Sequence, residues 1–247
     1  RTTLGYEKDA LVPYAVAALL NYLHETQKHG VERIKTVQNY ADAQYMRLSP
    51  VTRANLELTE TMRGREKRGT LLWVLDKTET SMGKRLLRSW IEQPLVDADA
   101  INARLCAVQA LYSASIARAD LKEALGHVFD IERLTTRILY GSATPREVKA
   151  LGDTCAMLPQ VKAQAAACGA PLLTQLADQI DLLEDVLQNI QTALVDDPPA
   201  NMKDGGAIRA GFNSEVDELR DIMHGGKGYL SNLEARYREE TGIPKLK

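Results

Sequence analysis

The 247-residue chain has few of the features that build disulfide frameworks, zinc sites or membrane spans. Its three cysteines, Cys106, Cys155 and Cys168, are odd in number, and no two are separated by only two residues. This spacing supports neither a zinc site nor a disulfide framework, and it is typical of reduced, cytosolic cysteines. The longest apolar run, residues 14–20, is far shorter than the roughly 20 residues that cross a bilayer. We therefore expect a cytoplasmic protein without a membrane span.

Histidine is also scarce, with four residues in the chain, and their spacing does not favour catalysis. His24 and His29 resemble the pair of a zinc-protease helix but are five positions apart. At about 100° per residue, such a step places the two rings on different helix faces. His127 and His224 are isolated, and no Ser–His–Asp arrangement follows from the spacing. We predict no catalytic and no metal-binding residue in this chain.

Residues 64–70 have the glycine spacing of a phosphate-binding loop, with Gly64 and Gly69 at its two ends. The Lys that must follow the second glycine is missing, and no buried strand precedes the segment. We therefore predict no cofactor-binding residue here.

The formal net charge of −2 argues against a surface built entirely to hold nucleic acid, yet positive charge gathers between residues 63 and 88. One interpretation is that these residues contact a phosphate backbone. The other is that they form a solvated loop and helix face. We favour the second, because no aromatic residues lie between the cations to stack on bases. If the first interpretation holds, the DNA-binding residues are Arg63, Arg65, Lys67, Arg68, Lys84, Arg85 and Arg88, with Lys77 nearby.

A second charged stretch, residues 178–197, holds six carboxylates and no Lys or Arg. Paired carboxylates suggest acid–base or metal chemistry. Asp181, Glu184 and Asp185, however, fit the outward face of an amphipathic helix, which is the interpretation we favour.

Helical periodicity dominates the sequence and predicts an all-α fold. The capping residues Asp97 and Thr144 each begin a helix, and the second begins with the capping-box pattern Thr-Pro-Arg-Glu. The helix after Asp97 is expected to turn Ile101, Leu105, Val108, Leu111 and Tyr112 inward. Residues 34–38 and 45–48 alternate weakly and predict a minor β-hairpin, and residues 58–68 predict a loop. The other predicted helices cover residues 13–28, 50–56, 71–75, 82–92, 131–140, 172–179 and 182–194.

The last segment has a narrower apolar pattern, typical of a long helix. From Val216 to Tyr237, apolar residues recur at alternating steps of three and four, which forms a heptad-like seam. A single helix over residues 214–241 would span about 42 Å. Gly225, Gly226 and Gly228 each cost up to about 1 kcal/mol against Ala, and we expect one helix with at most a bend there.

Several segments resemble successive landmarks of the core domain in the MutS family of DNA mismatch-repair proteins. The clearest is residues 69–95, two short amphipathic helices around a polar turn, closed by Pro94. Others are LLNYLHETQ (19–27), TRANLEL (52–58), FDIERLTTRILYG (129–141), DDPPANMKDGGAIRAGF (196–212) and REETGIPKLK (238–247). The resemblance covers essentially the whole chain in the family's order.

The resemblance implies that the chain is a piece of a longer protein with three parts: residues 1–30, the end of a connector domain with a linker helix; 31–213, a helical core; and 214–247, a lever helix leading toward an absent clamp domain. The parent would be a homodimeric, DNA-dependent ATPase that uses ATP and Mg, binds mismatched double-stranded DNA through its other domains and works with a MutL-type partner. No Phe-x-Glu tripeptide and no complete Walker loop occur in this chain, so the family's DNA-reading and ATP-binding residues have no counterparts here.

We therefore expect a core and lever region, without enzymatic activity or cofactor of its own, that transmits conformational change between ATPase and clamp. The alternative is a free-standing helical scaffold or protein-interaction module. Direct DNA binding through the basic residues at 63–88 stays open as a further possibility.

Overall fold

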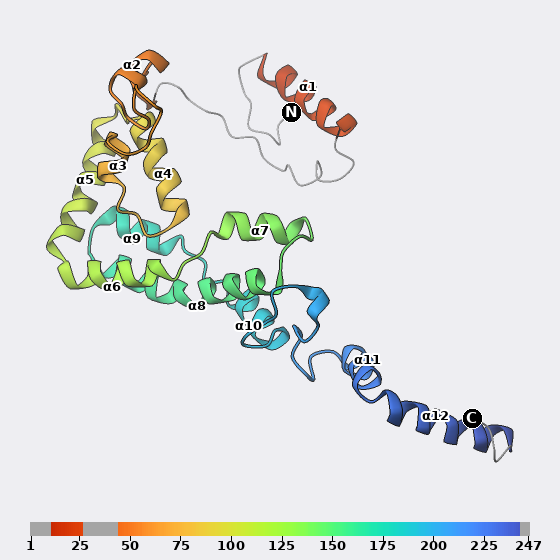
Figure 1. Cartoon of the computed structure of the whole chain (residues 1–247). Coiled ribbons are helices and arrows are strands. Elements are labelled where there is room, and N and C mark those ends of the chain that lie inside the picture. The colour runs from red at the N-terminus through yellow and green to blue at the C-terminus, as the bar shows by residue number, and fades with distance from the viewer. Residues whose placement is uncertain (1–10, 27–43, 243–247) are drawn as a thin grey trace. The chain divides into compact units, whose positions relative to one another are not determined.

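The structure, a computed structural model, describes residues 11–26 and 44–242. Contacts divide the chain into two units, residues 1–47 and 48–247. The described part of the first unit contains helix α1 (Val12–Thr26), close to the predicted 13–28 (Figure 1). One strand of the predicted hairpin, 34–38, lies outside the described residues, so the hairpin stays a prediction. The predicted domain boundaries at residues 30 and 213 also stay predictions.

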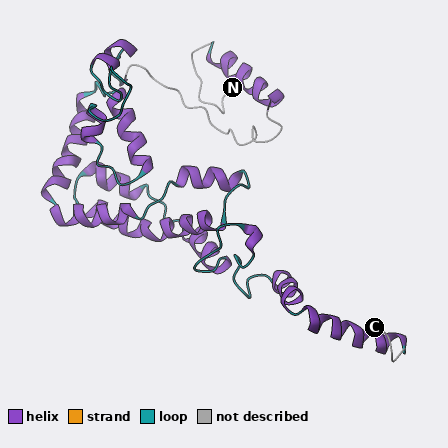
Figure 2. Ribbon diagram, in the orientation of Figure 1, coloured by secondary structure: helices purple, strands orange, loops and turns teal. Residues whose placement is uncertain are grey.

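The second unit is built from helices, which confirms the all-α class (Figure 2). An isolated antiparallel bridge joins Leu194 and Ile208. The helices are α2 (Pro50–Asn55), α3 (Leu71–Leu75), α4 (Ser81–Glu92), α5 (Ala98–Ser113), α6 (Ser115–Gly126), α7 (Ile131–Leu139), α8 (Pro145–Ala167), α9 (Pro171–Asp178), α10 (Glu184–Ala193), the short 3-10 helix η4 (Met202–Asp204), α11 (Ser214–His224) and α12 (Gly226–Thr241).

Local capping chemistry sets where these helices begin. The predicted capping box is confirmed at α8, where the Thr144 N–H donates to Glu147 Oε2 at 2.8 Å and the Glu147 N–H donates to Thr144 Oγ1 at 3.3 Å. Asp97 caps α5 as predicted, accepting from the Ala100 N–H at 2.7 Å. Each such bond satisfies an amide that the helix itself leaves without a partner.

Helix α8 is the centre of the second unit and packs against α6, α7, α9 and α10. Its first half contributes Leu151 and Cys155 to a core cluster of buried side chains, which also contains Leu134, Ile190, Leu194 and Ala207. Gly152 lies at the closest approach of α8 and α10, since a Cβ there would stand 2.8 Å from Ile190 Cγ2. Pro159 lies inside α8 and supplies no backbone donor to its helix.

Helices α5, α6 and α9 have small residues in their buried positions. Ala107 of α5, Ala124 of α6, Ala165 of α8 and Ala177 of α9 are all buried. Such small side chains let helix backbones approach closely, and the larger residues are then turned outward. The predicted inward face of α5 is therefore wrong at three positions: Leu105, Val108 and Tyr112 are exposed by 58%, 62% and 75%.

The end of the chain corrects the prediction of a single long helix. Helices α11 and α12 are separated at Gly225, whose backbone (φ −99°, ψ 19°) is not helical. Three glycines within four residues cost about 3 kcal/mol of helix propensity against alanine, which accounts for the division. The seam residues Leu219, Met223, Leu230 and Tyr237 are exposed by 45% or more.

Candidate functional site

Residues 61–68, here called the cationic loop, lie between α2 and α3 and are closed by hydrogen bonds. The Thr61 N–H donates to the Glu66 carbonyl at 2.9 Å, and the Glu66 N–H donates to Thr61 Oγ1 at 3.0 Å. Thr61 Oγ1 in turn donates to the Arg63 carbonyl at 2.8 Å. Glu57 Oε1 accepts from the Met62 N–H at 2.8 Å. The predicted loop at 58–68 therefore contains a turn that the hydrogen bonds of Thr61, Glu66 and Glu57 hold in place.

Thr70 anchors the C-terminal end of this loop. Its side chain is almost wholly buried, donates to the Lys67 carbonyl at 2.7 Å and accepts from the Trp73 N–H at 3.1 Å. The threonine that follows Gly69 is thus occupied in capping the five-residue helix α3.

The structure divides the predicted basic residues into two halves. In the loop half, Arg63, Arg65 and Lys67 are exposed, and none makes an ion pair with a carboxylate of the described residues. The fourth cation, Arg68, lies with its guanidinium carbon 6.0 Å from the centre of the Trp73 ring.

In the helix half, carboxylates already neutralise the cations. Lys84 Nζ lies 2.8 Å from Asp76 Oδ2, and this hydrogen bond, with a smaller contribution from Thr78, lowers the pKa of Asp76 to about 2. Arg88 pairs with Glu92 on the same helix at 2.8 Å. These two cations are thus less available to an external anion than those of the loop half.

Arg85 is the centre of a charged joint, defined here as Arg85, Asp130 and Glu132. Its guanidinium donates to both oxygens of Asp130, at 2.6 and 3.0 Å, and also to Glu132. Asp130 at the same time caps α7 by accepting from the Arg133 N–H at 3.3 Å. The hydrogen bond from Arg85 holds the pKa of Asp130 below its ordinary value, and Arg85 itself has a raised pKa for the same reason.

Two further contacts hold α4 and the turn before it against other helices. Lys122 of α6 lies 3.1 Å from Glu79, which precedes α4. Arg104 of α5 stacks over Trp90 of α4, with its guanidinium carbon 3.8 Å from the ring centre. No residue of α4 is buried. The apolar residues Met82, Leu87 and Ile91 of this helix are only partly buried, and charged and stacked contacts add to them.

The other residues considered from the sequence do not converge. His24 lies in the last turn of α1, and His29 is outside the described residues. Glu184 and Asp185 occupy the first turn of α10, where the helix dipole favours negative charge. Within residues 11–26 and 44–242, no group of three or more His, Cys, Asp or Glu side chains is arranged to hold a metal ion.

Cys155 is the one fully buried cysteine among the described residues. Burial raises the pKa of its thiol, so the side chain stays protonated and packs as a small apolar group.

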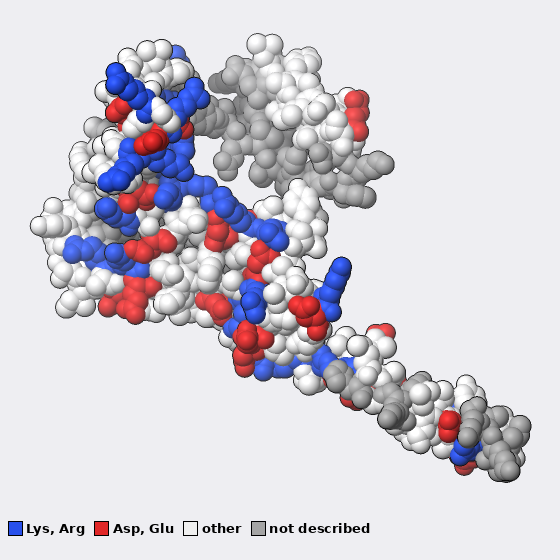
Figure 3. All heavy atoms as spheres, viewed as in Figure 1, with Lys and Arg blue, Asp and Glu red and all other residues white. Residues whose placement is uncertain are grey.

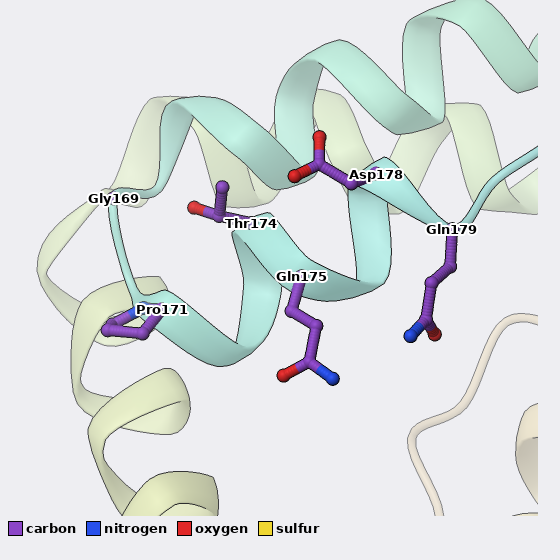
Figure 4. A pocket seen from close by; sticks show the side chains of 6 residues that line it. All are labelled: Gly169, Pro171, Thr174, Gln175, Asp178 and Gln179. Carbon is purple, nitrogen blue, oxygen red and sulfur yellow. The ribbon is translucent and has the colours of Figure 1, made fainter.

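An open hollow of about 670 Å³ lies beside α9 (Figure 4). The polar side chains around it point to different sides of the helix, with Thr174 and Asp178 away from Gln175 and Gln179. It is lined by Gly169, Pro171, Thr174, Gln175, Asp178 and Gln179. Because its polar groups do not converge, the hollow lacks the arrangement of a ligand site.

No helix of the described residues is both long enough and apolar enough to span a bilayer.

Comparison with known proteins identifies the family. The family model described as MutS domain III matches residues 51–241. The chain is 42% identical over 244 residues to the DNA mismatch repair protein MutS of Lachnoclostridium phytofermentans, covering 99% of this chain and 26% of that protein. It is 43% identical over 245 residues to MutS of Alkaliphilus oremlandii (99% and 28% covered) and 44% identical over 243 residues to MutS of Symbiobacterium thermophilum (98% and 28% covered).

The chain thus spans about a quarter of the length of the curated relatives that it matches. The match extends over the capped helices, the charged joint and the divided terminal helix described above. The chain belongs to the MutS family of DNA mismatch-repair proteins, and residues 51–241 form its domain III.

Proposed function

We propose that this chain is the core and lever region of a DNA mismatch-recognition protein, and that it transmits conformational change between an ATPase domain and a DNA clamp. The parent protein would be a homodimer that binds mismatched double-stranded DNA, uses ATP and Mg, and works with a MutL-type partner in the cytoplasm. The region itself would catalyse no reaction and hold no cofactor. Family membership supports the repair role, and the arrangement of the helices supports the transmission role.

The observation that carries the transmission role is the contrast between one apolar core and polar connections on either side of it. Around α8, buried residues of α7 and α10 form a closed cluster with Leu151 and Cys155. On the N-terminal side, α4 has no buried residue and is held by the charged joint. A packed core that resists deformation can pass on a displacement, while polar connections can shift between discrete arrangements.

On the C-terminal side, α11 is joined to the preceding segment by hydrogen bonds. Arg220 donates to the Ile208 carbonyl at 2.9 Å and pairs with Asp217 at 2.9 Å. Asp217 also accepts from the Gly211 N–H at 2.6 Å. The lever would therefore consist of two helices with a joint at Gly225, in place of one straight rod.

A proline in α12 of the full-length protein tests the transmission role. Leu230 is 59% exposed, so its replacement removes little buried surface, yet proline inside a helix costs about 3 kcal/mol or more. We expect Leu230→Pro to retain nucleotide binding and DNA binding while losing the ATP-dependent acceleration of DNA release, measured by stopped-flow fluorescence.

Leu230→Ala is the matched control, because it removes the same side chain and leaves the helix intact. We expect it to release DNA at the rate of the unmodified protein. A normal release rate in Leu230→Pro would exclude α12 as the transmitting element.

A further inference from the structure

The cationic loop presents its charges from a turn that is already ordered. Residues 62–69 are all exposed, while the Thr61 and Thr70 hydrogen bonds described above fix the backbone on both sides. Arg65 adopts a left-handed backbone (φ +50°), next to Gly64 at φ +86°. A polyanion would therefore meet cations whose backbone needs no ordering on binding, which removes one entropic cost.

Positive charge in this chain is concentrated around that loop. Residues 47–92 contain ten Lys and Arg against six Asp and Glu, a formal +4, in a chain whose total is −2. Figure 3 shows Lys and Arg gathered over the α2–α4 end of the second unit. Lys84, Arg85 and Arg88 are paired with carboxylates, whereas Arg63, Arg65 and Lys67 are three exposed cations close together in the cationic loop that have no such partner among the described residues.

We propose that the cationic loop binds the phosphate backbone of duplex DNA, as an additional, sequence-independent contact beside those made by the rest of the parent protein. That the ligand is DNA rests on the proposed function. The residues of the loop determine which part of the DNA is contacted. Arg63, Arg65 and Lys67 can each meet a phosphate oxygen. Trp73, 50% exposed, is one aromatic ring beside Arg68, which is too few for a row of stacked bases. The contact is therefore with phosphates and does not distinguish bases.

The test measures duplex binding by the 247-residue chain as a function of salt. Fluorescence anisotropy with a labelled duplex, between about 50 mM and about 200 mM salt, gives the slope of log K against log salt, to which each contacted phosphate contributes about −0.9. We expect Arg63→Gln/Arg65→Gln to reduce the magnitude of this slope by about 2 and to weaken binding equally for matched and mismatched duplexes.

Lys84→Gln/Arg88→Gln is the matched control, since it removes the same two formal charges from the helix half. We expect its slope to equal that of the unmodified chain. Arg63→Lys/Arg65→Lys keeps both charges, and we expect its slope to equal that of the unmodified chain. A reduced slope in the Gln variant alone would then result from the lost charges and not from unfolding. Far-UV circular dichroism of each variant verifies its helix content.

Two results would overturn this proposal. One is the absence of duplex binding at about 50 mM salt, where phosphate contacts are strongest. The other is an equal loss of slope in the loop and helix variants, which would indicate a general effect of net charge. Neither result bears on transmission, because the Leu230→Pro experiment measures release from a protein that binds DNA through its other domains.

Discussion

The core around α8 and the segment around α4 are both helical, yet they are held in place by different forces. The core buries Leu134, Leu151 and Ile190 against one another. Helix α4 buries no residue and is held by Arg85, by the stack of Arg104 on Trp90 and by Glu79 just before it. Apolar side chains carry no charge for salt to screen or acid to titrate, whereas ion pairs respond to both. The same unit therefore contains one region whose stability depends little on charge and one whose stability changes with salt concentration and pH.

The largest effect is expected when a core side chain is truncated. Leu151 is buried, so Leu151→Ala removes apolar contacts and leaves a cavity that costs about 2–5 kcal/mol of unfolding free energy. Leu105→Ala is the matched substitution on an exposed face, for which we expect a change of about 0.5 kcal/mol or less. Urea denaturation measures both. Equal losses in the two variants would contradict the assignment of the core to α8.

A smaller loss is expected when the close approach of α8 and α10 is filled. In Gly152→Ala the new Cβ would stand 2.8 Å from Ile190 Cγ2, and such overpacking costs about 1–3 kcal/mol. Gly126→Ala, at the end of α6, meets nothing within 4 Å and should be neutral or stabilise by up to about 1 kcal/mol. Thermal unfolding measures the stability of the two variants against that of the unmodified chain. If Gly152→Ala is also neutral, the helices do not pack as closely as described.

The charged joint is expected to show a pH dependence that the core lacks. The pKa of Asp130 is lowered in the folded chain, chiefly by Arg85. Its ionised form therefore contributes stability above the unfolded pKa, near 4, and that contribution is lost as pH falls through the folded pKa. In Arg85→Ala, the pKa of Asp130 should return toward its ordinary value. The stability difference from the unmodified chain should then be largest above the unfolded pKa and shrink as the pH falls through the folded pKa.

Urea midpoints between about pH 2 and pH 7 measure this dependence. Arg88→Ala is the control, because its partner Glu92 lies four residues away on the same helix and such pairs contribute about 0.3–0.5 kcal/mol. A difference between Arg85→Ala and the unmodified chain that does not vary with pH would show that Asp130 is not the group coupled to Arg85.

The sequence was most informative where a structure depends on neighbouring residues. The capping box at Thr144, the cap at Asp97 and the bounds of α3 were all predictable, because each follows from a local hydrogen bond or a backbone preference. The glycines at 225, 226 and 228 were also visible in the sequence, yet the prediction of one continuous helix was wrong at Gly225.

Features that depend on packing between distant residues were not predictable. The prediction for α5 is wrong because it turns the large apolar residues inward, whereas Ala107 is the buried position and Leu105 is exposed. Helix α6 was not predicted as a separate element, since it packs through Ala124 and lacks a large apolar stripe. The partners of Arg85 lie 45 and 47 residues away, and no local pattern indicates such a pairing.

Pro159 has a consequence for the helix on which the whole unit is centred. Without an N–H at residue 159, the carbonyl of Cys155 has no donor four residues ahead in α8. The residues before this gap pack against Ile190 and Leu134, and those after it include Lys162, which donates to the Ile180 carbonyl at 3.0 Å. The hydrogen-bond ladder of the longest described helix is thus interrupted at one defined point, between two ends that have different neighbours.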